Sequence, residues 1–184
     1  MRSSSTRKSA SASGSAPQQT YALVRFPNGE TRRMNAGPHT DISKAVIEVF
    51  APTFLAEPSV IFCRQSGNEA IAKEVELLRA LRLTPPANLT LPDIILVDLD
   101  PAHPLLVFVE IGRSEGIIND ARKTALLQIA DQAGFASQNV ALVAAFLDRK
   151  SANLGKAAGS LTWGSYAWFA FEPNDLMVMR SVRG

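Results

Sequence analysis

The chain contains very little cysteine and no long hydrophobic run. Cys63 is the only cysteine among 184 residues, which excludes an intrachain disulfide and a cysteine-based zinc site. No apolar stretch approaches the roughly 20 residues that a membrane-spanning helix needs. Basic residues near the N-terminus, such as Arg7 and Lys8, are not followed by a hydrophobic segment, so we expect no secretory signal. Together these shortages favour a cytoplasmic protein with no membrane partner.

Charge of either sign is also modest, because the formal net charge is only +2 at pH 7. This balance permits nucleic-acid binding without requiring it. About 46% of the residues are hydrophobic, which is enough for the core of one compact domain. Residues 1–20 are rich in Ser, Ala and Gln and cannot bury enough apolar surface to become ordered. We therefore expect a disordered tail over 1–20 and one domain over 21–184.

Hydrophobic periodicity predicts alternating helices and strands after the tail. The Asn28-Gly29 turn predicts a hairpin, and the continuous apolar run 140–147 is typical of a central strand covered on both faces. Strands are expected at 21–26, 31–34, 60–63, 94–97, 105–109, 140–147, 166–171 and 176–179. Helices are expected from 40 to close to Pro52 and at 69–82, 119–133 and 151–158. This order predicts an α/β fold with a mixed central β-sheet flanked by helices.

Two acidic residues flank the expected hairpin over 93–110. If Asp98 lies opposite Leu105, then Asp93 lies opposite Glu110, and directly opposed residues have Cβ atoms roughly 5 Å apart. Two carboxylates that close repel each other unless they share a proton or a cation. A divalent cation with oxygen ligands, most often Mg²⁺, fits this pair. Two solvated carboxylates at the ends of a hairpin are the alternative.

A set of short motifs surrounds this hairpin in a fixed order. Before it, Gly37 and His39 precede the helix that runs into the segment 44–52. The hairpin itself begins with Leu91-Pro92-Asp93 and ends on Glu110. The motifs that follow it are Ser114, Gly116, Arg122, Phe146, Asp148-Arg149-Lys150, Trp163, Trp168 and Glu172-Pro173. In this order, residues 36–180 resemble the BsuBI/PstI family of type II restriction endonucleases, which belongs to the PD-(D/E)XK nuclease group.

The resemblance implies a restriction-endonuclease-like fold and a Mg²⁺ site built from Asp93 and Glu110. Glu48 is a candidate third carboxylate from the first helix, with a solvated helix residue as the alternative. The resemblance also implies double-stranded DNA as the partner and a homodimer that acts on a palindrome such as CTGCAG. His39 is a candidate general base, although capping or packing of the helix is the alternative. Trp163, Tyr166 and Trp168 are expected in the core rather than on DNA bases.

A lysine two residues after the glutamate would complete the group's motif, but Gly112 stands there. Arg122 and Lys123, on the next helix, are the candidates for the missing positive charge, because a cation helps to neutralise charge that develops on the phosphate. Arg122 is favoured, since the family match falls on it. Candidates for DNA contacts, mostly to phosphates, follow the strand that ends at Glu110 and are Arg113, Ser114, Asn119, Arg149, Lys150 and Lys156.

Other departures from the family leave the activity open. Arg64-Gln65-Ser66 replaces a Gly-Asp-Thr segment, and Glu115 and Ala125 replace a histidine and a glutamate. Relatives also carry a mainly helical N-terminal region with no counterpart here, so we expect a catalytic module alone or a shortened relative. The sequence thus predicts a Mg²⁺-dependent type II restriction endonuclease, part of a restriction-modification system. A catalytically impaired DNA-binding remnant, or an α/β interaction module, are the alternatives.

Overall fold

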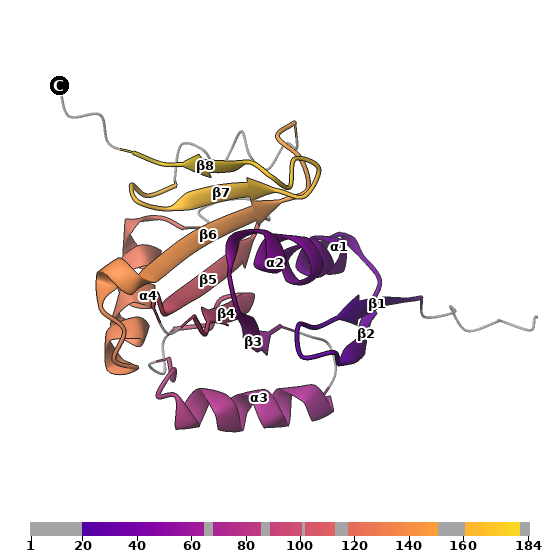
Figure 1. Ribbon diagram of the computed structural model, residues 1–184, viewed down its shortest axis with the longest axis horizontal. Coiled ribbons are helices and arrows are strands. Elements are labelled where there is room, and N and C mark those ends of the chain that lie inside the picture. Colours follow the sequence, from indigo (N-terminus) through magenta and orange to yellow (C-terminus); the bar gives the residue numbers. More distant parts are fainter. Residues whose placement is uncertain are drawn as a thin grey trace, which may run out of the picture.

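A six-stranded mixed β-sheet forms the centre of the protein in the computed structural model (Figure 1), which describes residues 20–64, 68–85, 89–100, 102–112, 118–150 and 161–180. The strands lie in the order β3-β4-β5-β6-β7-β8. Their bounds are Pro58–Cys63 (β3), Ile94–Asp98 (β4), Leu105–Ile111 (β5), Val140–Phe146 (β6), Tyr166–Phe169 (β7) and Leu176–Val178 (β8). The sheet confirms the predicted α/β architecture.

Strand direction reverses three times across this sheet. β3, β4 and β5 pair antiparallel, β5, β6 and β7 pair parallel, and β8 is antiparallel to β7. The end of β3, the start of β4 and the end of β5 therefore lie at one end of the sheet, and β6 also ends there. Helix α4, Asp120–Gln132, makes the crossover from β5 to β6. A short 3₁₀ turn, Ser137–Asn139, follows it.

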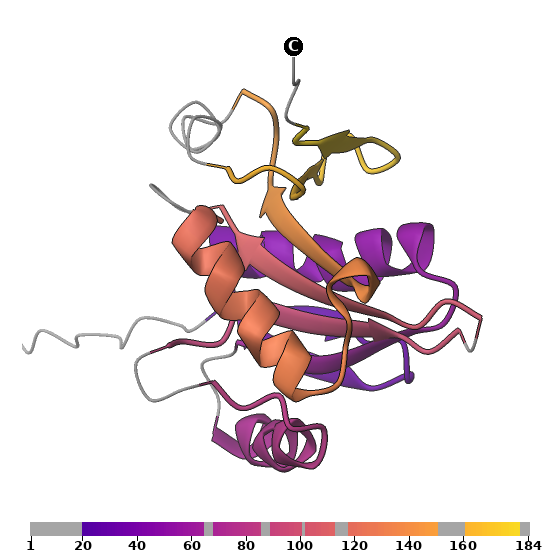
Figure 2. The same ribbon diagram turned by 90° about the vertical axis from the view of Figure 1, so that its left-hand side faces the viewer.

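Helices cover both faces of the sheet, as Figures 1 and 2 show together. Helix α1 (Pro38–Ala45), the π-helical turn η1 (Val46–Phe50) and helix α2 (Ala51–Phe54) lie on one face, and α4 lies on the other. Strand alternation supplies a core to each face. In β4, Ile94 and Leu96 join the core under α1, whereas Ile95 and Val97 join the core under α4. All five residues of β4 are buried, so this strand is covered on both faces.

The first helix changes its hydrogen-bonding pattern just before Pro52, the residue expected close to its end. Pro52 has no N–H to continue the regular α-helical pattern. The N–H of Ala51 reaches back five residues to the carbonyl of Val46, which is the π-helical pattern. Helix α2 then adds one more turn and ends at Phe54.

The N-terminal hairpin predicted from the Asn28-Gly29 turn is confirmed, but it forms a two-stranded sheet separate from the central one. β1 (Tyr21–Arg25) and β2 (Thr31–Asn35) pair antiparallel and lie beside α1 (Figure 1). Helix α3, Asn68–Ala80, runs below β3 in the same view. The buried carboxylate of Glu74 on α3 accepts hydrogen bonds from Arg32 of β2 and from the backbone N–H of Cys63. This carboxylate links the hairpin, α3 and β3.

Two further expectations can be compared with the structure. Trp168 is fully buried, as expected, but Trp163 is 55% exposed, so its placement in the core was wrong. Trp163 lies in a turn before β7 rather than in the strand, and the alternation of a strand does not extend to it. The expected helix over 151–158 and residues 1–19 of the expected tail over 1–20 lie outside the described residues. No helix in the described part of the chain is long and apolar enough to cross a bilayer.

Candidate active site

The register of the β4–β5 hairpin brings Asp93 next to Glu110. Asp98 pairs with Leu105, as predicted, and Ile94 pairs with Val109 at the other end of the ladder. Asp93 precedes Ile94, and its Oδ2 accepts a hydrogen bond of 2.9 Å from the N–H of Ile111, the residue after Glu110. The two acids therefore lie at the same end of the same strand pair.

Arg122 forms the closest contacts to the Glu110 carboxylate. Its Nε and Nη2 lie 2.7 and 2.5 Å from Oε1 of Glu110, and its Nη1 donates to the carbonyl of Thr90 at 2.7 Å. Asn119 caps α4 by accepting a 2.8 Å hydrogen bond from the N–H of Arg122, as the sequence predicted. Oε2 of Glu110 accepts no hydrogen bond from any described residue. One carboxylate oxygen of Glu110 is thus available to a ligand.

Two other basic side chains contact Asp93. His39, in the first turn of α1, places Nε2 3.2 Å from Oδ1 of Asp93, and Arg64 places Nε 3.1 Å from the same oxygen. Arg64 directly follows β3, and its backbone N–H also donates to the carbonyl of Asp93 at 2.8 Å. His39 was recognised as a candidate from the sequence. Arg64 was noted only as a departure from the family pattern.

The two carboxyl groups differ in their tendency to ionise. Burial disfavours the charged form of Asp93, but hydrogen bonds from His39 and from the Ile111 N–H, with the charge of Arg64, outweigh burial and lower its pKa. Burial raises the pKa of Glu110, and the neighbouring charge of Asp93 adds to this rise, although Arg122 opposes both. A carboxyl pair whose pKa values are pushed apart is typical of a functional site.

The donor set of this pair fits a magnesium ion that binds through few protein ligands. Mg²⁺ is commonly held by one or two carboxylates and completes its shell with waters and substrate phosphate oxygens. Within the described residues, no group of three or more His, Cys, Asp or Glu side chains is arranged to hold a metal. A metal at Asp93 and Glu110 would therefore depend on water and substrate for its remaining ligands.

The position of the missing motif lysine is sterically closed. A Cβ atom added to Gly112 would lie 2.3 and 2.5 Å from two ring atoms of Phe146 and 3.2 Å from the carbonyl of Ala145. Phe146 belongs to the neighbouring strand β6 and is itself buried. The positive charge of this site must therefore come from other elements.

Lys123 and Arg149 contact other groups instead of the two acids. Lys123, the other candidate for the motif charge, donates from Nζ to the carbonyl of Trp163 at 2.6 Å and makes no contact with Glu110. Arg149 lies 2.5 Å from Glu172 and stacks on Phe169. Lys150 is exposed. Arg113, Ser114 and Lys156 lie outside the described residues.

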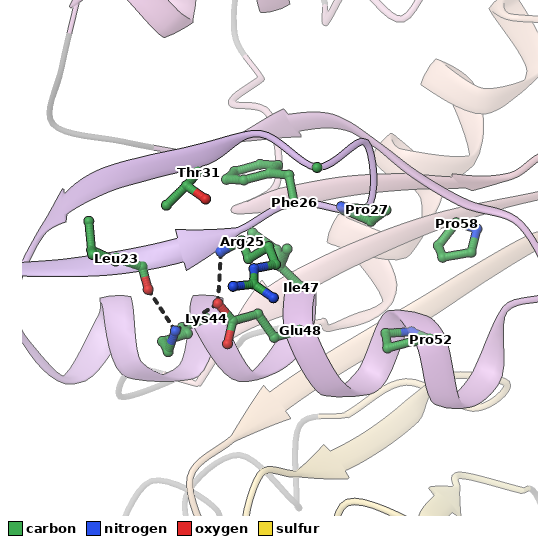
Figure 3. A pocket seen from close by; sticks show the side chains of 11 residues that line it. Leu23, Arg25, Phe26, Pro27, Thr31, Lys44, Ile47, Glu48, Pro52 and Pro58 are labelled. Carbon is green, nitrogen blue, oxygen red and sulfur yellow. Dashed lines mark hydrogen bonds and ion pairs between the residues drawn. The ribbon is translucent and has the colours of Figure 1, made fainter.

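Glu48 is not brought to the two acids. Its Oε1 accepts hydrogen bonds of 2.7 Å from the backbone N–H of Arg25 and from Nζ of Lys44 (Figure 3). It lies nine residues along the helical segment from His39, which corresponds to about 13 Å of helix. A pocket of about 630 Å³ beside Glu48 lies between the hairpin and this helix. Neither Asp93 nor Glu110 lines that pocket, so its size does not mark it as the reactive site.

A smaller pocket of about 390 Å³ lies against Glu110. It is lined by Leu89, Thr90, Glu110, Asn119, Ala121, Arg122 and Ala125. Ala125 stands where the family pattern has a glutamate, so this wall of the pocket is apolar. The pocket gives a ligand access to the acidic residue and its arginine.

Comparison with known proteins identifies the family. Residues 22–181 match the model of the BsuBI/PstI restriction endonuclease domain. The chain belongs to this family. It is 24% identical over 166 residues to the type II restriction enzyme BsuBI of Bacillus subtilis, a match that covers 90% of this chain and 50% of that enzyme. The resemblance inferred from the motif order is thereby confirmed.

The fold of this chain also resembles that of a restriction enzyme whose structure has been solved. The structure of SdaI restriction endonuclease superposes with a TM-score of 0.70 over 89% of this chain and 49% of that chain, at 18% sequence identity. This match confirms the restriction-endonuclease-like fold. The chain spans about half the length of the relatives that it matches.

Proposed function

We propose that this chain is a Mg²⁺-dependent endonuclease that hydrolyses phosphodiester bonds of double-stranded DNA. The observation that supports this proposal best is the meeting of Asp93 and Glu110 at one end of the β4–β5 pair. Membership of a restriction endonuclease family supplies the substrate class. Water attacks phosphorus, the bond to the 3′ oxygen breaks, and the products carry a 5′-phosphate and a 3′-hydroxyl.

Each residue of the site has a distinct part in this reaction. When bound, Mg²⁺ would polarise the phosphate and lower the pKa of a water. The interactions that lower the pKa of Asp93 favour its charged form, so it offers a charged oxygen ligand. Arg122 opposes the rise in the pKa of Glu110, and an arginine acts electrostatically rather than as a base. Asn119 fixes the start of α4, on which Arg122 lies.

DNA contacts extend this proposal beyond the two acids. Arg149 and Lys150 follow the end of β6, at the same end of the sheet as Glu110. We assign them, with Arg113, Ser114 and Asn119, to phosphate or base contacts, which fix the register of a protein on DNA. A homodimer acting on a palindrome would place two such sites on opposite strands.

Plasmid cleavage tests the proposal directly. The protein is incubated with a supercoiled plasmid that contains CTGCAG, with Mg²⁺ or with EDTA, beside Asp93→Asn and Glu110→Gln. Asp131→Asn is the matched control, because Asp131 is an exposed carboxylate near the far end of α4. We expect Mg²⁺-dependent nicking or linearisation that both site variants abolish and the control retains. Cleavage that survives Asp93→Asn and Glu110→Gln would contradict the proposal.

A DNA-binding remnant without catalysis is the second candidate, and one observation favours it. The motif lysine is absent and its position is closed by Phe146. Salt-sensitive binding of the same plasmid without Mg²⁺-dependent cleavage would identify this remnant, because neutralised phosphates make affinity fall with salt.

A further inference from the structure

The site needs a cation that faces the substrate, and two candidates from the sequence do not meet this need. Arg122 uses Nε and Nη2 on Glu110 and Nη1 on Thr90, and its side chain is only 17% exposed. Lys123 is held by the carbonyl of Trp163. Position 112 cannot accept a side chain while Phe146 keeps its place.

Arg64 differs from these residues in exposure and in the number of its free donors. Its side chain is 48% exposed, although its Nε contacts Asp93 and its Nη2 donates to the carbonyl of Leu91. Among the described residues, none accepts a hydrogen bond from Nη1 of Arg64. The guanidinium is thus held along one edge and open to solvent along the other.

The backbone fixes Arg64 at the reactive end of the sheet. Cys63, the last residue of β3, pairs with Ile94 of β4, so the next residue lies beside Asp93. The N–H of Arg64 donates to the carbonyl of Asp93 at 2.8 Å. The positive charge of Arg64 favours the ionised form of both Asp93 and Glu110.

We propose that Arg64 is a catalytic residue of this chain, whose open guanidinium edge contacts a phosphate oxygen at the scissile bond. This inference rests on the proposed nuclease function. Arginine presents a planar fork of donors that fits phosphate oxygens, and charge-assisted hydrogen bonds of this kind are the strong ones. Arg64 lies outside the motif order by which residues 36–180 resemble the family, so the contact is inferred from the geometry of this chain.

Three variants test the contact. Arg64→Gln removes the charge, Arg64→Lys keeps a charge without the planar fork, and Arg79→Gln is the control. Arg79 is an exposed arginine near the end of α3, and no ion pair holds it among the described residues. Urea unfolding of each variant verifies that the fold is intact. Arg64→Lys preserves a cation beside Asp93 if Arg64→Gln fails to fold.

Cleavage is measured in single turnover with Mg²⁺, and binding is measured with a fluorescent CTGCAG duplex and Ca²⁺ in place of Mg²⁺. We expect Arg64→Gln to slow cleavage about 100-fold, the loss typical of removing one donor to developing charge. Arg64→Lys should retain an intermediate rate. The slope of log affinity against log salt should fall by about 0.9 for Arg64→Gln, which corresponds to one phosphate contact, and should not change for Arg79→Gln.

The binding slope separates this inference from the proposed function. If the unmodified protein binds the duplex but does not cut, the proposed nuclease activity fails, and the slope alone still decides whether Arg64 contacts phosphate. An Arg64→Gln slope equal to that of Arg79→Gln overturns the inference. If the unmodified protein is active and Arg64→Gln cuts at the same rate, the inference is also overturned, because Arg64 would then bind phosphate away from the reacting group. Arg64→Gln could instead raise the cleavage rate or the metal affinity while the slope of log affinity against log salt stays unchanged. Arg64 would then block Asp93 rather than contact phosphate, and this result also overturns the inference.

Discussion

Replacement of Gly112 by alanine gives a sharp test of the closed motif position. The added Cβ would lie 2.3 Å from Cδ1 of Phe146, and the ring cannot easily retreat, since it is buried and stacks on Phe169 with centroids 5.8 Å apart. Gly112 does not have a left-handed backbone conformation. If the space around Gly112 were open, alanine would therefore stabilise the protein by about 0.4–1 kcal/mol, because it lowers the conformational entropy of the unfolded chain. Overpacking reverses this sign and costs about 2 kcal/mol.

Urea unfolding of Gly112→Ala, Phe146→Leu and the double variant measures this clash. Phe146→Leu removes ring atoms and leaves room for the new Cβ, so the cost of Gly112→Ala should fall by at least about 1 kcal/mol in the double variant, because residues in contact are not additive. Gly112→Lys should likewise lose stability, because its Cβ meets the same ring. A Gly112→Ala protein as stable as the parent, or more stable, would refute the steric argument.

Three other predictions concern buried titratable groups. Cys63 should react with iodoacetamide at pH 8 about 1,000-fold more slowly in the folded than in the unfolded protein, measured by mass spectrometry, because burial raises the pKa of its thiol to about 12. Asp98→Asn should lower the free energy of unfolding by about 2 kcal/mol at pH 7 in urea titrations, since three backbone N–H groups donate to this carboxylate. Although burial opposes ionisation, these bonds lower the pKa of Asp98, so its contribution is present above the unfolded pKa and should vanish as pH falls through the folded one. Arg122→Ala should raise the pKa of Glu110 further, observed by NMR titration, and destabilise the fold by about 2 kcal/mol because it leaves a buried carboxylate unpaired.

The pairing of the two acids could be predicted because it depends on local sequence. A short turn joins two apolar strands, and the alternation of side chains leaves little freedom of register. Once Asp98 lies opposite Leu105, the position of Asp93 beside Glu110 follows by counting. The helices were predictable for the same reason, since their apolar stripes repeat within single segments.

Arg122 was singled out through the motif order, but the contacts of His39 and Arg64 with Asp93 could not be predicted, because these residues come from distant segments. His39 and Arg64 reach Asp93 from α1 and from the end of β3, and no local pattern encodes such contacts. Lys123 follows Arg122 directly, but consecutive helical residues point about 100° apart, and only Arg122 faces Glu110. The closure of Gly112 depends on Phe146, which lies on another strand.

The arrangement explains how this chain has a charged site although Gly112 stands where the motif lysine would be. The acids are fixed by strand register, so a change there would displace the whole hairpin. The cations are not fixed in this way. Basic side chains at the same end of the sheet come from three elements, namely α1, the end of β3 and α4. A positive charge lost from one element can therefore be supplied by another without a change of fold. Arg64 is the side chain at this end that combines a direct contact to Asp93 with a largely exposed guanidinium.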